Sequence, residues 1–210
     1  MRVTIVGTGA MARGIATRAL AGGHQVTLVG THLAKATDLA DELAGEGDVQ
    51  AAERVDGDLV VLAVPYTEAP HVVREHADEL ADSVIVDPTN PIDVSTLEPL
   101  GPDYIGPFAS GAQAIASEAP DAALVKAFNT TFAGTLVAGH VGGRPFDVFL
   151  AGDDGEAKAR VAALVRDGGL RPVDAGPLAR ARELEAAGLL HMSVQAALGT
   201  AFGSALAVLP

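Results

Sequence analysis

The chain has 210 residues, 49% of them hydrophobic, and it carries a formal net charge of −13. A chain of this length can bury a sizeable core, and its acidity argues against nucleic acid as a partner. The absence of cysteine excludes disulfides, thiolate metal sites and cysteine nucleophiles. No apolar signal segment follows Arg2 and no apolar run has the length of a membrane span, so we expect a cytoplasmic protein without a membrane partner.

The N-terminal residues carry the most informative pattern in the chain. The β-branched run at residues 2–6 predicts a buried strand, and residues 10–20 predict a helix. Between them, Gly7 and Gly9 with Ala12 form the dinucleotide-binding fingerprint Gly-x-Gly-x-x-Ala. The first glycine would make the tight turn, the second would leave room for a pyrophosphate, and the alanine would let the helix lie close to the strand. The alternative is a purely structural glycine turn.

The second predicted strand, residues 25–29, indicates which dinucleotide is preferred. NAD-selective sites usually place an acidic residue after this strand, to hold the ribose 2′-hydroxyl. Here Thr31, His32 and Lys35 follow instead, and a 2′-phosphate suits this set whereas an acid would repel it. We therefore predict NADP(H). The alternative is that Thr31 only caps the helix at residues 33–43 and that Lys35 is solvated surface.

The rest of the chain alternates strands and helices, which predicts a Rossmann-type α/β fold with a doubly wound parallel sheet. A linker-like stretch at residues 139–145 predicts two domains, an NADP(H)-binding domain at 1–140 and a small C-terminal α/β extension at 141–210. The predicted strands are 48–51, 58–65, 83–87, 123–127, 147–151 and 170–175; the predicted helices are 68–80, 111–117, 153–168, 177–187 and an apolar 189–209; residues 93–108 are a predicted loop.

Two segments are predicted at the carboxyl edge of the sheet, where ligands lie in such folds. Ala63, Val64 and Pro65 end a continuous apolar strand, and we count them as cofactor-binding residues. Tyr66 would either stack near the cofactor or cover the helix that follows. The turn at residues 88–91 is held rigid by two prolines, and it would be either a structural turn or a cofactor wall.

The sequence contains no recognisable catalytic constellation. The six histidines lack the spacing of metal ligands, and no nucleophile elbow is present, so we predict no metal site and no catalytic side chain. His191 is the best single polar candidate to approach a substrate, the alternative being a surface or interface histidine. Hydride exchange between a nicotinamide and a flavin-like ring needs mainly two stacked rings in a water-poor slot, which Ala127, Ala133 and Gly134 could line.

The chain resembles the NADP-dependent coenzyme F420 oxidoreductases, and in part the cytosolic oxidoreductase domain of the STEAP metalloreductases. The first resemblance lies in the N-terminal strand-turn-helix, Thr31-His32, Ala63 to Tyr66, Gly152 to Asp154 and Gly169 to Leu178. The second lies in Val125 to Thr130 and Arg182 to Glu185. Together the matches extend over essentially the whole chain.

The resemblance implies hydride transfer between NADP(H) and coenzyme F420 in a homodimer or higher homo-oligomer formed through the C-terminal helix. An NADPH:flavin reductase acting on FMN or FAD, and a non-catalytic NADP(H)-binding sensor, are the alternatives. The acceptor ring would stack near Ala133 and the terminal helix. The implied NADP(H) contacts are Gly7, Thr8, Gly9, Ala10 and Met11 at the pyrophosphate; Thr31, His32 and Lys35 at the 2′-phosphate; and Ala63, Pro65, Tyr66, Pro91, Ala127 and Asn129 around the ribose and nicotinamide.

Two positions lead to more specific expectations. The family usually has arginine where His32 stands, so selection of the 2′-phosphate would be weaker or pH-dependent here. Lys126 ends an apolar strand, where an ammonium needs a carboxylate partner. We expect a structural Lys126 paired with Glu183 or Glu185.

Overall fold

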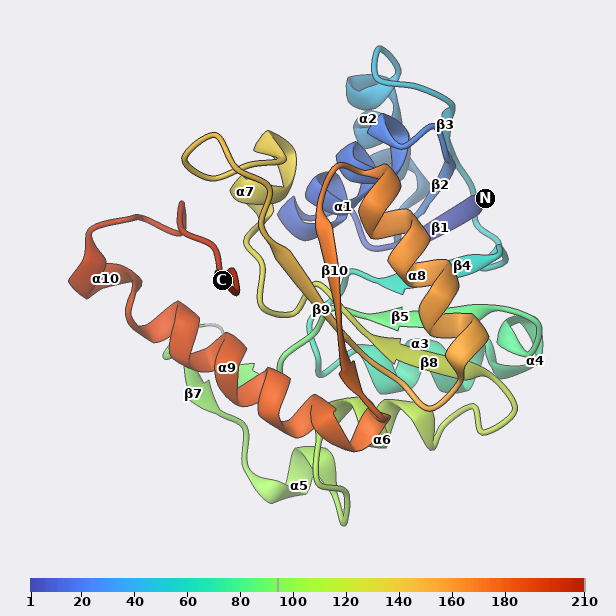
Figure 1. Cartoon of the computed structure of the whole chain (residues 1–210). Helices are drawn as coiled ribbons and strands as arrows, with labels where there is room; N and C mark the ends of the chain where they lie inside the picture. Colours follow the sequence, from blue (N-terminus) through green and yellow to red (C-terminus); the bar gives the residue numbers. More distant parts are fainter. Residues whose placement is uncertain (94, 210) are drawn as a thin grey trace.

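The computed structural model describes residues 1–93 and 95–209, and one sheet organises them (Figure 1). Eight strands of these residues lie in the order β10-β9-β8-β5-β4-β1-β2-β3. They are β1 (Arg2–Val6), β2 (Gln25–Val29), β3 (Val49–Ala51), β4 (Leu59–Leu62), β5 (Val84–Asp87), β8 (Ala123–Lys126), β9 (Asp147–Ala151) and β10 (Arg171–Gly176). A separate pair, β6 (Ile92–Asp93) and β7 (Glu98–Pro99), is antiparallel.

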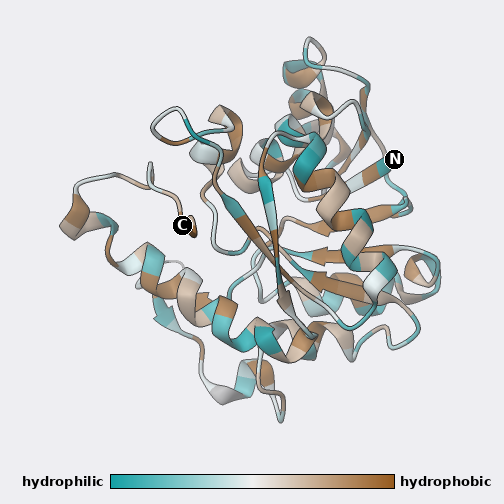
Figure 2. Cartoon of the chain, in the orientation of Figure 1, coloured by the Kyte–Doolittle hydropathy of each residue, from teal (hydrophilic) through white to brown (hydrophobic). Residues whose placement is uncertain are grey.

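Helices cover both faces of the sheet. On one face of the sheet, α1, α2, α7 and α8 pack in one buried apolar core. On the other face, α3, α4, α6 and the start of α9 pack in a second core. Figure 2 shows the central strands largely in the hydrophobic colour, as burial between two layers requires. The helices are α1 (Ala10–Ala21), α2 (Leu33–Leu43), α3 (Ala69–Glu75), α4 (Ala77–Leu80), α5 (Pro102–Ile105), α6 (Gly111–Ala116), α7 (Ala133–Ala138), α8 (Gly155–Asp167), the 3₁₀ helix η1 (Leu178–Arg180), α9 (Ala181–Ser193) and α10 (Gln195–Leu198).

The topology confirms the predicted Rossmann-type fold. β1 pairs in parallel with β2 on one side and with β4 on the other. Successive strands therefore extend the sheet in opposite directions from the point between β1 and β4. Ligands bind at this switch point in doubly wound sheets. β9 and β10 continue the same sheet, since β9 meets β8 in an antiparallel bridge between Ala151 and Lys126. The domain boundary near residue 140 stays a prediction.

Several predicted elements have different bounds in the structure. The predicted helix 68–80 is split at His76 into α3 and α4. The strand predicted at 58–65 is regular only over β4, and its last residues are already part of the connection. The predicted loop 93–108 contains β7 and α5, which are too short for periodicity to reveal, and its Val94 lies outside the described residues.

The C-terminal helices were predicted with the wrong bounds. α9 runs through the break predicted near residue 188 and ends at Ser193, and after α10 the chain is not helical. Gly199, at φ +63°, adopts the left-handed conformation that ends helices. The apolar tail then returns to the sheet, where the Asp147 N–H donates to the carbonyl of Leu206 (Figure 1). Its apolar composition therefore reflects packing as a strap, and the predicted helix 189–209 is wrong beyond residue 198.

Among the residues that the structure describes, no helix combines the length and the apolar character that crossing a membrane requires.

Candidate functional site at the carboxyl edge of the sheet

Gly7 lies where three strand ends meet. Its N–H donates to the Val29 carbonyl at 2.7 Å, and its backbone has φ +124°. A Cβ at this position would lie 2.2 Å from the carbonyl oxygen of Ala63. Since no side chain fits that gap, the structure confirms that the first fingerprint position needs glycine. The fingerprint loop and the end of β4 are thereby in direct contact at the switch point.

The second fingerprint glycine faces open space. Gly9 is the exposed N-cap of α1, and no atom lies within 4 Å of the position that a Cβ would take. Ala10 and Met11 follow in the first helical turn, whose N–H groups have no partners inside the helix. Ala12 is fully buried in the core. This end of α1 offers an anion the open space, the free donors and the positive dipole end that a pyrophosphate needs.

The loop after β2 lies beside this opening. A Cβ on Gly30 would lie 2.9 Å from the Thr8 side chain, so the two loops approach each other closely. Thr31, His32 and Lys35 are exposed next to it. The N-cap of α2 is His32, without a side-chain hydrogen bond, so the alternative in which Thr31 serves as the cap is wrong. The predicted pyrophosphate and 2′-phosphate residues therefore form neighbouring parts of one surface.

A cavity of about 380 Å³ lies at the same edge of the sheet, beside the start of the fingerprint helix at Met11. It lies between the turns after β5 and β8, the starts of α1 and α7, the end of α9 and the tail. None of the described residues that line it has a charged or titratable side chain. The lining residues are Met11, Pro88, Asn90, Asn129, Thr131, Phe132, Ala133, Gly134, Met192, Ala201 and Phe202.

The cavity brings together some of the predicted site residues. Met11, Asn129 and Ala133 line it, as does the predicted Gly134. Ala127 has no exposed surface and supports the wall from behind. The lining also does not include Ala63, Val64, Pro65 or Pro91, which are partly or fully exposed at the strand ends. Their contacts with a cofactor stay predictions.

Two asparagines join adjacent walls of this cavity. Asn90 Nδ2 donates to the Asn129 carbonyl at 2.8 Å, and Asn129 Nδ2 donates to Asn90 Oδ1 at 2.9 Å and to the Leu184 carbonyl at 2.8 Å. Within the described residues, Asn129 Oδ1 is buried without a hydrogen-bond partner. A Cβ on Gly188 of α9 would lie only 2.9 Å from the Asn129 carbonyl oxygen. The turn at residues 88–91 is therefore rigid and at the same time part of a cavity wall.

Lys126 has the carboxylate partner that the sequence predicts. Its Nζ lies 2.8 Å from Asp87 Oδ2 and 3.0 Å from Glu185 Oε1, and it donates to the Thr89 carbonyl at 2.6 Å. Glu185 is thus confirmed, whereas Glu183 is exposed and pairs with an arginine. Burial alone would lower the pKa of Lys126, but the two carboxylates outweigh it and raise that pKa.

Asp87 was missed as a partner of Lys126. It ends β5 and lies directly opposite Lys126 in the parallel register of β5 and β8. An acid that ends one buried apolar strand and a lysine that ends another were the available signals. These two signals indicate an ion pair only once β5 and β8 are known to be neighbours.

His191 is a buried residue that does not line this cavity, so it is not a surface histidine. It is 5% exposed, lies outside the cavity lining, and its ring centroid is 4.4 Å from that of Phe132. Nδ1 is 3.1 Å from the Thr130 carbonyl and Nε2 is 2.8 Å from Ser204 Oγ. Burial lowers the pKa of His191, against a smaller opposing effect of the Thr130 carbonyl. The residue therefore fastens the C-terminal tail behind the cavity wall.

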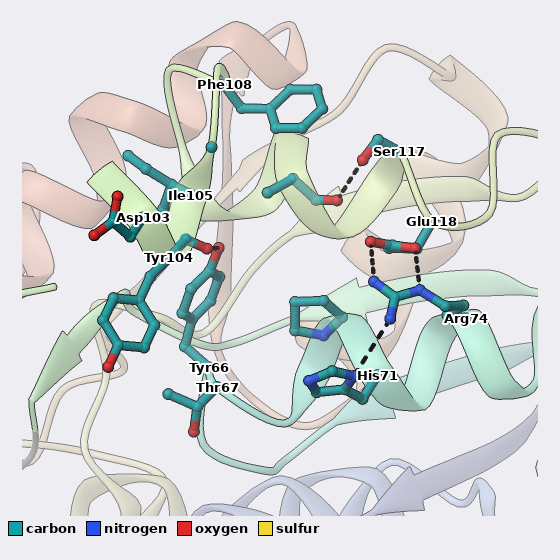
Figure 3. A pocket seen from close by; sticks show the side chains of 13 residues that line it. Tyr66, Thr67, His71, Arg74, Asp103, Tyr104, Ile105, Phe108, Ser117 and Glu118 are labelled. Carbon is teal, nitrogen blue, oxygen red and sulfur yellow. Dashed lines mark hydrogen bonds and ion pairs between the residues drawn. The ribbon is translucent and has the colours of Figure 1, made fainter. Parts of the chain in front are cut away.

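Tyr66 belongs to a different cavity, of about 540 Å³, between α3, α5 and α6 (Figure 3). Its ring lies against Gly111 of α6, and its hydroxyl donates to the Tyr104 carbonyl at 2.9 Å. Burial, with a smaller effect of Glu185 and Asp87, raises the pKa of Tyr66 to about 12. The structure therefore buries Tyr66 against α5 and α6, and its predicted contact with a cofactor stays a prediction.

Polar side chains in the wall of this second cavity form hydrogen bonds with one another. Figure 3 shows Arg74 joined to Glu118 by two hydrogen bonds, of 2.7 and 2.6 Å, with His71 on the other side of the guanidinium. It contains none of the fingerprint residues.

A doubly wound sheet with a dinucleotide fingerprint at its switch point, and an uncharged cavity at the same edge, defines a Rossmann-type dinucleotide-binding protein. Residues 2–91 match the family described as NADP oxidoreductase, coenzyme F420-dependent. Over these residues the chain is similar to the NAD(P)-dependent oxidoreductases of this family.

Similar proteins extend the likeness beyond residue 91. Metalloreductase STEAP3 of Rattus norvegicus is 33% identical over 185 residues, which cover 88% of this chain and 36% of that protein. A candidate F420-dependent NADP reductase from Arthrobacter sp. FB24 has a TM-score of 0.83 at 29% identity, with 99% of each chain covered. A hypothetical protein from Sinorhizobium meliloti has a TM-score of 0.74 at 28% identity over 85% of this chain and 86% of its own.

Proposed function

We propose that this protein transfers hydride between NADP(H) and the deazaflavin coenzyme F420 by direct stacking of the two rings. The observation that carries the proposal is the uncharged cavity that adjoins the fingerprint helix at Met11. Ring-to-ring hydride transfer needs orientation and exclusion of water more than it needs acid–base groups. The name of the similar Arthrobacter protein points to the same pair of reactants.

The residues present fit NADP(H). The open space at Gly9 and the free N–H groups of the first turn of α1 would hold the pyrophosphate. Thr31, His32 and Lys35 would hold the 2′-phosphate from the neighbouring loop. The unpartnered Oδ1 of Asn129 is available to accept a hydrogen bond from a carboxamide. NADPH, when bound, supplies the hydride.

The cavity side chains would orient the acceptor and keep water away from it. Phe132 and Phe202 pack edge to face, with ring centroids 5.1 Å apart, and Met11 and Met192 add further apolar surface. Reduction of a deazaflavin takes up one proton together with the hydride. Since the lining has no titratable side chain, this proton would be exchanged with solvent at the cavity mouth.

Spectroscopy tests the proposal directly. Purified protein is mixed with NADPH and with F420, FMN or FAD in turn, and the loss of the reduced-nicotinamide band at about 340 nm is followed. We expect turnover with F420. Turnover with FMN or FAD alone would instead support a flavin reductase, the alternative favoured by the STEAP-like block at residues 125–130. Tight NADPH binding without turnover would support a sensor.

We also propose a cytoplasmic homodimer or higher homo-oligomer that forms through the C-terminal helix and tail. Leu190, Leu198 and Leu209 are 63%, 60% and 67% exposed on this segment, and exposed apolar side chains would be covered in such an interface. Light scattering after size exclusion should give a multiple of 21.2 kDa. Leu190→Glu with Leu198→Glu should give the monomer mass. A wild-type monomer would contradict this part of the proposal.

A further inference from the structure

Asp87, Lys126 and Glu185 form a buried ion cluster that the proposed hydride transfer does not use. The side chains of Asp87 and Lys126 are 0% exposed and that of Glu185 is 9% exposed. Two carboxylates here surround one ammonium. Burying such groups is costly, and apolar replacements of similar volume often leave a protein as stable or more so. Stability alone is therefore a poor reason for this cluster.

Each member of the ion cluster lies on a segment that continues into a wall of the cavity. Asp87 ends β5, and Asn90 lines the cavity three residues later. Lys126 ends β8, and Asn129 lines the cavity three residues later. Glu185 lies on α9, the helix whose Met192 lines the third side. The segments that form the three walls are thus connected through the ammonium group of Lys126.

The hydrogen bonds continue from the ion cluster into the walls. Lys126 Nζ donates to the Thr89 carbonyl at 2.6 Å, within the turn that carries Asn90. The Glu185 carboxylate accepts hydrogen bonds from the backbone N–H groups of Gly111 and Ala112, at 3.0 and 3.1 Å, which fixes α9 against α6. The ion cluster therefore restrains both turns and the helix at once.

The segment after Lys126 needs such a restraint. Phe128, a buried non-glycine residue, has φ +64°, in the left-handed region that side chains rarely adopt. Strained backbone of this kind persists only where its surroundings hold it in place, and it gathers at ligand sites. Lys126 on one side and the paired Asn129 on the other hold it here.

We propose that Lys126 is a positioning residue, which through Asp87 and Glu185 holds the three walls of the cavity in register around the nicotinamide end of the cofactor. The inference rests on the proposed function only in assigning the nicotinamide to this cavity. It assigns no proton or hydride to Lys126, which remains charged and buried. The adenine end of the site, at Thr31, His32 and Lys35, is outside its reach.

The test separates the two ends of the site. Lys126→Met removes the charge and keeps the apolar stem, and Lys158→Met is the matched control because Lys158 pairs at 3.0 Å with Asp174 between α8 and β10, away from the cavity. Adenosine 2′,5′-bisphosphate measures binding at the adenine end. The fluorescence of bound NADPH reports the surroundings of the nicotinamide, and it needs no turnover.

We expect Lys126→Met to lower kcat for F420 reduction about tenfold to a hundredfold, as misplaced reacting groups do. The fluorescence gain of bound NADPH should fall with it, while the affinity for adenosine 2′,5′-bisphosphate and all properties of Lys158→Met stay at wild-type values. Glu185→Gln keeps the Lys126–Asp87 pair and should show a smaller loss in the same direction.

The inference is overturned if folded Lys126→Met has wild-type kcat and fluorescence, or if both ends of the site weaken equally. Should Lys126→Met fail to fold, Glu185→Gln decides by the same two readouts. Wild-type protein that binds NADPH but reduces no acceptor would contradict the proposed function. The fluorescence comparison would still decide the role of Lys126.

Discussion

The two ends of the candidate site are built in opposite ways. The nucleotide end, at residues 7–11 and 31–35, is partly or fully exposed and depends on backbone: a glycine turn, a helix start and a loop of polar side chains. The cavity end depends on side chains, some buried and some, like Phe202, exposed, and these are held by the Asn90–Asn129 pair and the buried ion cluster. One end uses a single short stretch of chain, whereas the other collects residues from Met11 to Phe202.

This difference shows which part of such a site is general and which is particular. A pyrophosphate can be held by N–H groups that any backbone provides, so a few glycines suffice. An acceptor ring has to be enclosed by side chains of fitting shape, and those must be held from behind. We therefore expect substitutions at the two ends to affect different ligands.

Gly7→Ala should have the largest effect. The new Cβ would lie 2.2 Å from the Ala63 oxygen at a backbone φ of +124°. Left-handed strain and overpacking together should lower the free energy of unfolding by about 2–5 kcal/mol, measured by urea denaturation. Gly9→Ala is the control, since its Cβ meets no atom within 4 Å. It should fold normally yet bind NADPH less tightly; unchanged NADPH binding would contradict the pyrophosphate assignment.

Thr31→Ala with His32→Ala should act at the nucleotide end alone. Losing charge-assisted contacts to the 2′-phosphate should weaken NADPH binding by about 1.5–3 kcal/mol and leave NADH binding nearly unchanged. Titration calorimetry with both cofactors measures the difference. Equal weakening of both would contradict the 2′-phosphate assignment.

Gly188→Ala should act at the cavity end. Alanine normally favours a helix, but here its Cβ would lie 2.9 Å from the Asn129 carbonyl oxygen and 3.0 Å from Asn90 Oδ1. We expect a loss of about 1–3 kcal/mol in unfolding free energy and a lower kcat, with binding of adenosine 2′,5′-bisphosphate unchanged. Gly155→Ala, in open space on α8, should be neutral or stabilising. A stabilised Gly188→Ala with full activity would mean that α9 does not need this close approach.

The smallest effect should come from pH. Burial lowers the pKa of His191 below its usual 6.5, so between these two values the unfolded chain binds a proton that the folded protein does not. The contribution of His191 to the free energy of unfolding should be fully present above about pH 6.5 and fall as the pH decreases through this window. His24, whose pKa is also lowered, acts in the same direction. Melting temperatures of His191→Gln should therefore depend less on pH than those of wild type; an unchanged dependence would contradict this role.

The sequence predicted the elements whose physics is local. Gly7 and Gly9 predicted the strand-turn-helix, and continuous apolar runs predicted the central strands, which the structure confirms. The same approach failed at the tail, where an apolar run was taken for a helix. Apolar residues serve a strap across the sheet as well as they serve a helix, and Gly199 alone was a weak sign of the break.

At the cavity, the sequence indicated which side chains need a partner but not which residues those partners are. Lys126 at the end of an apolar strand required a carboxylate, and Glu185 was correctly among the candidates. Asp87 could not be chosen, because its pairing depends on β5 and β8 being neighbours. His191, on the predicted terminal helix, stood out as the best single polar candidate to approach a substrate. Only the fold shows that it faces Thr130 and Ser204 behind the wall.

By itself, the sequence determined the fold class, the fingerprint turn and the carboxylate requirement of Lys126. Each of these follows from residues near one another in the chain or from the cost of burying a charge. Only the tertiary structure decided how the cavity is enclosed and how Asp87, Lys126 and Glu185 hold its walls. These features join distant segments, such as those of Asp87 and Glu185 in the ion cluster and those of Met11 and Phe202 in the cavity. The spacing within a single segment carries no information about which distant segment will pack against it.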